Sequence, residues 1–394
     1  MKILSENKGS ATVFICIILG SLFTCVMILA GLSKDVCVKS QNMSMLSLSS
    51  KSVMSEYCKP LYKRYGIMAM DLSKKTISDK FKFYIEENTE NFIGDINVMT
   101  GNYCLGNIDN FERQITEYSK ILVEKNLLIQ KEEKQKNEKE PSVLKNTLII
   151  NCLPSKNVEK KGINILDISF DDLKKDTFFD RSKNSVLGNE YLMNKFSNHI
   201  RDNGDSFFSN EVEYILAGNF SDEKNYEEVK GKLLLIRNIA NIAYIESSAE
   251  MKAKITAASL AAGAGAEVAY LTILETWALA ESYNDLKILE DGKLVPIIKT
   301  ADTWATDLQS VIENKEQEYI DIQSETGMDY EDYLQVMLFL LDREEKYVRC
   351  MDLIQINMQG TYNRNFYMST AYTGFDYSVE IDREKYENSE KYIK

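Results

Sequence analysis

A long apolar run lies near the beginning of the sequence. Residues 11–32 are 22 residues without a charged side chain, and about 20 apolar residues suffice for a helix to cross the hydrocarbon core of a membrane. We therefore predict a transmembrane helix here. After Gly31 neither Gly nor Pro occurs until Pro60, so nothing in the sequence ends the helix at the edge of the membrane.

The pattern continues beyond the apolar run as an amphipathic stem. Apolar side chains recur there at a spacing of three and four, which is typical of a helix that packs against other helices. One helix over residues 12–59 would be roughly 70 Å long at about 1.5 Å per residue. The predicted stem-packing residues are Val36, Met43, Leu46, Val53 and Tyr57.

The rest of the chain has mainly helical periodicity. Apolar residues at helical spacing predict four further helices, while short apolar segments bounded by turn residues favour strands. The fold class is therefore α+β and mainly helical, with a long N-terminal transmembrane and stem helix and a small antiparallel sheet. The predicted helices are 110–130, 225–247, 249–283 (interrupted at Gly263 and Gly265) and 330–358; the predicted strands are 142–153, a hairpin over 286–297, and one or two strands in 366–381.

The same pattern divides the chain into consecutive regions. The charged run KEEKQKNEKEP has too little apolar area to offset the cost of ordering, so we interpret it as a linker. The regions are a cytoplasmic N-terminus at 1–10, the transmembrane helix at 11–32, the stem helix at 33–60, a stem-proximal region at 61–130, the linker at 131–141, and a mainly helical ectodomain with a small sheet at 142–394.

The charged residues exclude some kinds of partner and predict how the chain is oriented in the membrane. The chain has 394 residues and a formal net charge of −13, which argues against a nucleic-acid partner. No polybasic cluster flanks the apolar run, which argues against binding to an anionic lipid surface. Lys2 and Lys8 precede the run, whereas Lys34 and Asp35 follow it and cancel. The positive-inside rule therefore predicts a single-pass protein of the cell membrane, with a cytoplasmic N-terminus and an extracytoplasmic C-terminal domain.

A secretory signal peptide is the alternative interpretation of the apolar run, because a basic start and an apolar middle are common to both. The run is longer than the ~7–15 residues usual in signal peptides, and its end, MILAGLSKD, offers no A-x-A cleavage pattern. We favour a permanent anchor.

Seven cysteines are present, and two of them, Cys16 and Cys25, lie within the predicted span. The other five are an odd number, so at least one stays unpaired or pairs between chains. None forms Cys-x-x-Cys, and the spacings are too wide for a zinc module. We expect most of them to be small buried apolar residues.

Few residues are candidates for catalysis or for binding a metal or cofactor. His199 is the only histidine, which excludes a two-histidine metal site within one chain, and we expect it at a helix end. The Gly263–Glu267 run lacks the third glycine of a dinucleotide loop; we expect its small residues to allow close helix packing. Trp277 and Trp304 could line a groove, but on helical faces they are more often core.

Paired carboxylates are expected by chance among sixty acidic residues. Asp302 with Asp307, and Asp329 with Asp332, could serve as acid and base, but we expect helix caps or solvated faces. The loop at 202–205 has the oxygen-rich composition of a calcium loop but fails the EF-hand pattern, so we expect a turn. The sequence therefore predicts no catalytic or metal residues, no cofactor and no enzyme.

Several stretches spread over nearly the whole chain carry a family resemblance. They are KGSATVF before the apolar run, YGIMAMD after the stem, EVEYILAGN at 211–219, KLLLIRNIANIAY at 232–244, LVPIIKTADTW at 294–304 and GMDYEDYLQVMLFLLDREEKYVRCMDLIQINM at 327–358. In these stretches the chain resembles an uncharacterised family of membrane-anchored proteins from low-GC Gram-positive bacteria. At its amino end it is similar to the minor pilins of tight-adherence (Tad, or Flp) pilus systems.

That resemblance implies a candidate processing site. In such pilins a prepilin peptidase cuts after a glycine, and a glutamate five residues further on helps to register each subunit in the filament. Gly9 matches the glycine, and cleavage there would leave Ser10 as the first residue. Phe14 stands where the glutamate is expected, which leaves open an uncleaved membrane subunit.

Two main hypotheses of function follow, and an extracytoplasmic carboxylate-dependent hydrolase comes third. The first is a non-catalytic, membrane-anchored, extracytoplasmic structural or assembly subunit of a Tad-like pilus (a type IV filament) or secretion system, which packs with other subunits through its stem. The alternative is a membrane-tethered binding module or receptor for a cell-wall or surface partner.

Overall fold

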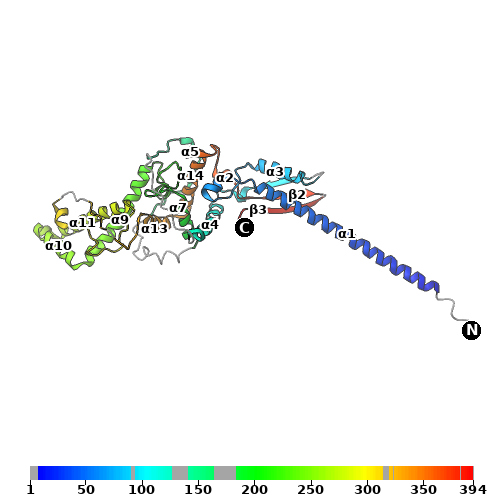
Figure 1. Cartoon of the computed structure of the whole chain (residues 1–394), viewed down its shortest axis with the longest axis horizontal. Coiled ribbons are helices and arrows are strands. Elements are labelled where there is room, and N and C mark those ends of the chain that lie inside the picture. Colours follow the sequence, from blue (N-terminus) through cyan, green and yellow to red (C-terminus); the bar gives the residue numbers. More distant parts are fainter. Residues whose placement is uncertain are drawn as a thin grey trace, which may run out of the picture.

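Helix α1 (Lys8–Met54) projects from one end of an elongated molecule in the computed structural model (Figure 1). The structure describes residues 8–89, 94–126, 141–163, 183–313, 319–322, 324–381 and 383–393. A small α/β part lies next to α1, a helical body follows, and a helical arm forms the far end (Figure 1). The predicted fold class, mainly helical with a small antiparallel sheet and a long apolar N-terminal helix, is confirmed.

α1 runs without a break through the predicted transmembrane and stem segments, but it ends at Met54, earlier than the sequence suggested. The chain turns over the next residues, and Cys58 becomes the N-cap residue of helix α2 (Lys59–Tyr65). Pro60 lies in the first turn of α2, where the missing N–H of proline costs no helical hydrogen bond. Pro60 therefore starts the second helix and does not end the first.

The second half of α1 packs on a three-stranded antiparallel sheet together with helix α3 (Lys74–Glu86). The strand order is β1 (Ile96–Met99), β2 (Gly374–Ile381), β3 (Glu384–Lys391). In the register, Ile96 lies opposite Val379 and Ile381 opposite Glu384. The core of this part consists of Leu46, Val53, Met54, Met70, Ile77, Phe81, Ile85, Val98, Phe375, Tyr377, Val379 and Tyr386.

Helix α14 (Arg343–Thr361) lies at the centre of the helical body, since its residues from Glu345 to Met358 are all buried. This burial on every face is typical of a core helix. The elements that form the body with it are α2, α4 (Ile108–Asn126), α5 (Thr147–Asn151), η2 (Pro154–Asn157), α7 (Lys183–Lys195), α8 (Glu211–Ala217), α13 (Tyr330–Leu340) and η5 (Met368–Thr370); η1 (Gly101–Tyr103) contacts β2.

The arm at the far end consists of α9 (Asp222–Ser247), α10 (Ala249–Ser259), η4 (Leu260–Gly265), α11 (Ala266–Glu290) and α12 (Leu308–Ile312) (Figure 1). Trp277 and Trp304 meet edge to face with ring centroids 5.4 Å apart. Both indole N–H groups donate to the carbonyl oxygen of Thr306, over 3.2 and 3.0 Å. The two tryptophans are thus part of the arm's small core, which confirms the interpretation from sequence.

Two of the predicted strand segments are wrong. Residues 142–153 contain α5, because the Asn146 side chain accepts hydrogen bonds from the N–H groups of Leu148 and Ile149 and caps a helix. The first part of the predicted hairpin belongs to α11, and Gly292 (φ 72°) follows the helix end. Short apolar runs fit a strand or a buried helix equally well by periodicity.

Most of the helical predictions are confirmed. The predicted helix 110–130 corresponds to α4 up to Asn126, and its last four residues lie outside the described ones; 225–247 corresponds to α9, and 366–381 contain β2. The block at 330–358 is two helices, because Asp342 accepts hydrogen bonds from the N–H groups of Glu344 and Glu345 and starts α14 anew. Gly263, with φ 57° and ψ −120°, interrupts the helix of the arm as expected. The linker at 131–141 lies, except for Pro141, outside the described residues.

Candidate functional site

The first half of α1 is an exposed apolar helix. All side chains from residue 12 to residue 41 are exposed, and large apolar ones such as Phe14 and Leu29 show 64% and 66% of their surface. By length and composition this helix could cross a membrane. A contiguous apolar surface of this size marks an interaction surface, with lipid or with protein.

The predicted stem-packing residues fall into two groups. Val36 and Met43 are exposed and free to meet a partner. Leu46 and Val53 are fully buried in the chain's own α/β core, so for these two the predicted role in subunit contact is wrong. Tyr57 is half-buried and packs edge-on against Tyr62 and Tyr392.

The candidate processing site lies at the start of α1. Gly9 and Ser10 are in its first turn, and Phe14 is one turn further on. The cysteines are all among the described residues and none is in a disulfide. Cys37, on the stem next to Val36, is exposed, whereas Cys58 and Cys350 are buried.

The residues considered for catalysis or metal binding have structural roles. His199 follows α7, stacks on Tyr226 at a centroid distance of 4.0 Å, and donates its backbone N–H to Glu213 over 2.8 Å. Asp307 caps α12, and Asp329 forms a capping box with Asp332 at the start of α13.

The remaining candidates are a loop and an exposed carboxylate. In the loop at 202–205 the Asp202 carboxylate accepts the N–H of Gly204 over 3.0 Å. Asp302 is exposed. Across the part of the chain that the structure describes, no cluster of three or more His, Cys, Asp or Glu side chains could hold a metal ion.

Most of the small residues at the tip of the arm are exposed. Ala257, Ala261, Ala262 and Ala264 are exposed and Ala258 is half-buried, so the close helix packing expected of these residues does not bury most of them. The tip also exposes Leu260, Val268 and Leu271. Together α10, η4 and α11 (Ala249–Glu290) form the second segment that is long and apolar enough to span a membrane. In its most apolar stretch of 18 residues, 11% of the residues are buried.

A buried charge network holds the base of the arm together. Arg237 of α9 pairs with Asp285 of α11 over 3.0 Å, and Lys299 pairs with Asp285 and Glu281 over 2.6 and 2.7 Å. All four side chains are buried. Burial raises the pKa of Asp285, but the charges of Arg237 and Lys299 outweigh this effect and the pKa is lowered. Because two buried cations and two buried carboxylates balance one another here, we assign this network a structural role.

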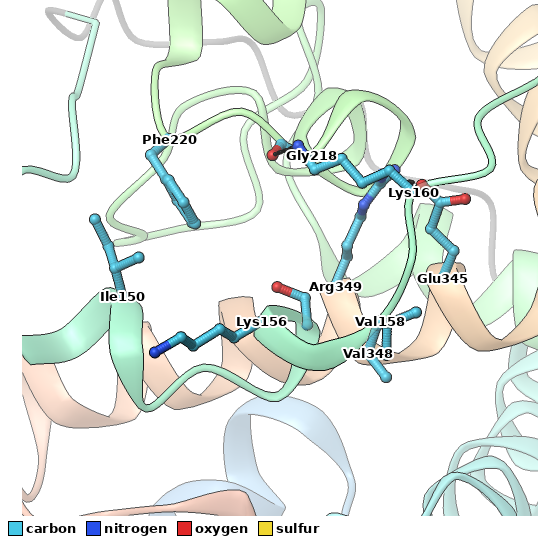
Figure 2. A pocket seen from close by; sticks show the side chains of 10 residues that line it. Ile150, Lys156, Val158, Lys160, Gly218, Phe220, Glu345, Val348 and Arg349 are labelled. Atoms are coloured by element: carbon cyan, nitrogen blue, oxygen red, sulfur yellow. Dashed lines mark hydrogen bonds and ion pairs between the residues drawn. The ribbon is translucent and has the colours of Figure 1, made fainter. Parts of the chain in front are cut away.

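A half-open pocket lies between α5, η2, α8 and α14 (Figure 2). Its volume is about 220 Å³, smaller than the roughly 300–1,000 Å³ of sites for drug-sized ligands. Figure 2 shows Phe220 and Ile150 on one side of the opening, Arg349 on the other, and Lys156 along the floor. The Lys156 ammonium lies beneath Ile150, where it donates to Oδ1 of Asn151 over 2.7 Å. The lining of the pocket is Ile150, Ser155, Lys156, Val158, Lys160, Gly218, Phe220, Glu345, Val348 and Arg349.

Two cations of this pocket hold the C-terminal end of α8. Arg349 donates to the carbonyl oxygens of Ile215 and Leu216 over 2.7 and 3.1 Å, and the Lys160 ammonium donates to Gly218 O over 2.7 Å. These carbonyls lack helical partners at a helix end, where positive charge is favourable. Gly218 has φ 69°, and a Cβ there would lie 2.6 Å from Nε of Arg349, so only glycine fits.

The carboxylates of the pocket region are already engaged. Glu345 pairs with Arg349 and accepts the backbone N–H groups of Lys161 and Gly162. Asp352 accepts the N–H of Ser155 over 3.0 Å and the hydroxyl of Tyr214 over 2.8 Å. Both carboxylates are thus held by donors of the protein itself.

The fold and the pocket define an elongated, mainly helical protein that exposes an apolar helix of membrane length and carries a small cationic pocket. The chain belongs to a protein family described as a family of unknown function (DUF5702), whose model matches residues 127–383. The match covers the helical body from α5 onward, the arm and every residue of the pocket; α1, α2, α3, β1 and α4 lie before it. No curated protein and no solved structure matches the chain.

Sequence reasoning did not find the pocket. Lys156, Lys160 and Arg349 come from two segments almost two hundred residues apart, and no local motif links them. The one signal was indirect: Gly218, after the apolar run of α8, is a typical helix-ending glycine, and the exposed carbonyls of a helix end attract cations.

Proposed function

We propose that the protein is a non-catalytic, extracytoplasmic structural or assembly subunit of a Tad-like pilus or secretion system, anchored in the cell membrane by α1. The N-terminus would be cytoplasmic, the first half of α1 would cross the membrane once, and the remainder would stand outside. The pilin-like role rests on the resemblance of the amino end to minor pilins.

The exposure of α1 is the observation that supports this proposal. Its first half is apolar, exposed on all sides and continuous with a second half that packs on a sheet. A soluble protein would gain by burying such a helix, at roughly 25 cal/mol per Å² of apolar surface. A membrane, or the neighbouring helices of a filament, would provide that burial.

The first experiment tests the anchor and its processing. We expect the native full-length protein in the membrane fraction, resistant to high salt and released by detergent, with the ectodomain open to protease from outside the cell. Mass determination of the amino terminus then separates the two forms, since a start at Ser10 means prepilin-type cleavage and a start at Met1 means a permanent anchor. Recovery of the full-length chain as a freely dissolved species would reject the proposal.

The second experiment tests whether stems pack together. Cys37 is exposed on the same stretch of the stem as Val36. A variant in which Cys16, Cys25, Cys104 and Cys152 are changed to Ser keeps Cys37 and the buried Cys58 and Cys350. Mild oxidation in cells should then crosslink the protein to itself, or, with a cysteine placed in a partner's stem, to that partner.

The matched control keeps Cys152, which is also exposed, in place of Cys37. It lies in the helical body and should not crosslink. Equal crosslinking of both variants would indicate random collision and contradict stem packing.

The cationic pocket favours a second candidate, a membrane-tethered binding module. In that case the stem would only space the ectodomain from the membrane. Loss of crosslinking at Cys37 together with retained ligand binding would favour it.

A further inference from the structure

A buried lysine contacts a buried side-chain amide between helices α7 and α14. The ammonium group of Lys346, in the first turn of α14, donates to Oδ1 of Asn189 over 2.9 Å and to the carbonyl oxygen of Leu338 over 3.1 Å. Lys346 is 3% exposed and Asn189 is 6% exposed. A buried lysine is ordinarily paired with a carboxylate. Both partners of Lys346 are neutral, however, and within the described part of the chain it forms no ion pair.

Burial makes this lysine a better nucleophile. It lowers the pKa of Lys346 to about 8, and the Arg343 guanidinium adds to this effect, whereas the Glu112 carboxylate opposes it. A lysine with this pKa is uncharged in about one molecule in ten at pH 7. Only the uncharged amine has a lone pair with which to attack a carbonyl carbon. The amine and the amide that it could attack are therefore already in contact.

A carboxylate lies near the pair. The Tyr347 hydroxyl donates to Oε1 of Glu112 over 3.3 Å. The same hydroxyl lies against the residue before Asn189, where it leaves no room for a Cβ at Gly188. The charge of Glu112 also acts on Lys346 itself. Glu112 is therefore a carboxylate that can take a proton from the lysine and pass it to a leaving group.

We propose that Lys346 and Asn189 join in an intramolecular isopeptide bond. Nζ of the uncharged lysine attacks Cγ of Asn189, so that the Nζ–Cγ bond forms and the Cγ–Nδ2 bond breaks. One proton passes from Nζ, by way of the Glu112 carboxylate, to Nδ2, which leaves as ammonia. The reaction needs no oxidant, cofactor or second substrate. It involves neither α1 nor another subunit, so it does not depend on the proposed membrane role.

The bond would close a loop that runs from Asn189 to Lys346 and contains α8, the whole arm and α13. A covalent link across so long a loop restricts the unfolded chain and so favours the folded one. None of the seven cysteines is in a disulfide. The amide link would thus supply the covalent cross-connection that disulfides give to many secreted proteins.

Peptide mapping of the full-length protein in detergent tests the bond. Trypsin does not cleave after a lysine whose amine is acylated, so the linked protein should give a branched peptide that joins residues 184–195 to residues 344–349. This peptide should be lighter than the sum of its two parts by about 17 Da, the mass of ammonia. Absence of the branched peptide from the folded protein would refute the proposal.

The chain contains a matched pair at its surface. Lys156 donates to Oδ1 of Asn151 over 2.7 Å, and both side chains are exposed. Water solvates this ammonium group, so we expect trypsin to cleave after Lys156 and the peptide to keep its full mass. Loss of ammonia with a link at this pair as well would overturn the role of burial.

Variants locate the reacting groups. Lys346→Arg and Asn189→Ala should each abolish the branched peptide, and circular dichroism should show both variants folded. An ammonia loss at Asn189 that persists in Lys346→Arg would place the reaction within the asparagine itself and refute the proposal. If a variant unfolds, the peptide map of the wild-type protein decides.

A third variant tests the carboxylate. In Glu112→Gln the branched peptide should accumulate at least ~10-fold more slowly in freshly expressed protein, because the proton acceptor is gone. Asp109→Asn is the matched control, since Asp109 also pairs with Arg343 but is exposed, and it should link at the wild-type rate. Equal rates in the two variants would overturn the role of Glu112.

Discussion

Both ends of the molecule carry apolar helical segments of membrane length, and they differ in their surroundings. At one end, α1 is exposed from residue 12 to residue 41. At the other, the pair α10–α11 is exposed at its tip but buried at its base, where Leu274, Trp277 and Ala278 are core residues (Figure 1).

The distribution of charge explains part of the difference. No charged residue interrupts α1 between residues 11 and 33, whereas Lys252, Lys254, Glu267 and Glu275 recur through α10 and α11. A charge at the centre of a bilayer costs about 2.5–3.5 kcal/mol on insertion scales. Mean hydropathy agrees with this difference, since it is twice as high in the first segment as in the second.

The largest expected effect concerns the boundary within α1. Leu46→Asp places a carboxylate in the α/β core, where Leu46 is 1% exposed, and should destabilise this part by about 5 kcal/mol. Val36→Asp, on the exposed half of the same helix, should change the unfolding free energy by less than about 0.5 kcal/mol. Urea unfolding followed by circular dichroism measures both, and similar losses would contradict the division of α1 into an exposed and a packed half.

The base of the arm should be the next most sensitive region. Asp285→Ala leaves Arg237 buried without its partner and Lys299 with one carboxylate fewer, at a cost of about 3–5 kcal/mol. Asp302→Ala, at an exposed position of the same arm, is the control and should be nearly neutral. Near-ultraviolet circular dichroism of the Trp277–Trp304 pair reports on the arm, and an unchanged spectrum and stability in Asp285→Ala would disprove the assigned structural role.

The stability of the helical body, which lies between the two ends, should depend on pH. Burial raises the pKa of Glu211 to about 7 and that of Asp352 to about 6. Because the folded state binds these protons more tightly than the unfolded chain, the stabilisation is complete below the unfolded pKa values and is lost as pH rises to about 7. The protein should be about 3 kcal/mol more stable at pH 5 than at pH 7.

Denaturant unfolding over this pH range measures the effect. In the double variant Glu211→Gln, Asp352→Asn, the unfolding free energy should change much less between pH 5 and pH 7. For each protein, its stability at one pH is compared with its own stability at the other. A wild-type stability that rises from pH 5 to pH 7 would contradict the assignment.

The smallest expected effect is at the turn of the arm. Gly263→Ala forces an L-residue into φ 57° and ψ −120° and should cost about 1–2 kcal/mol, confined to the exposed tip. Gly265→Ala is the matched control, because Gly265 has φ −95° and open space around it. Hydrogen exchange of the tip amides should increase only in the first variant; equal exchange in both would mean that Gly263 imposes no strain.

The sequence was informative where structure depends on local contacts. The apolar run of α1, the helices α4 and α9, and the caps at Asp307 and Asp329 all follow from spacing within one segment, because helical hydrogen bonds and caps join residues three or four apart. It was less informative for the sheet. β3 reads EKYENSEK, with Tyr386 its one buried residue, and becomes a strand because β2 offers it a partner.

Burial and the pocket were decided by the tertiary structure. Val36 and Leu46 are apolar residues of one helix with the same pattern around them, yet the first is exposed and the second buried. The reason is that α3 and the sheet, formed by residues distant in sequence, cover one and not the other. Lys156 and Arg349 likewise meet at one pocket because α5, η2 and α14 pack together, and no spacing along the chain encodes that proximity.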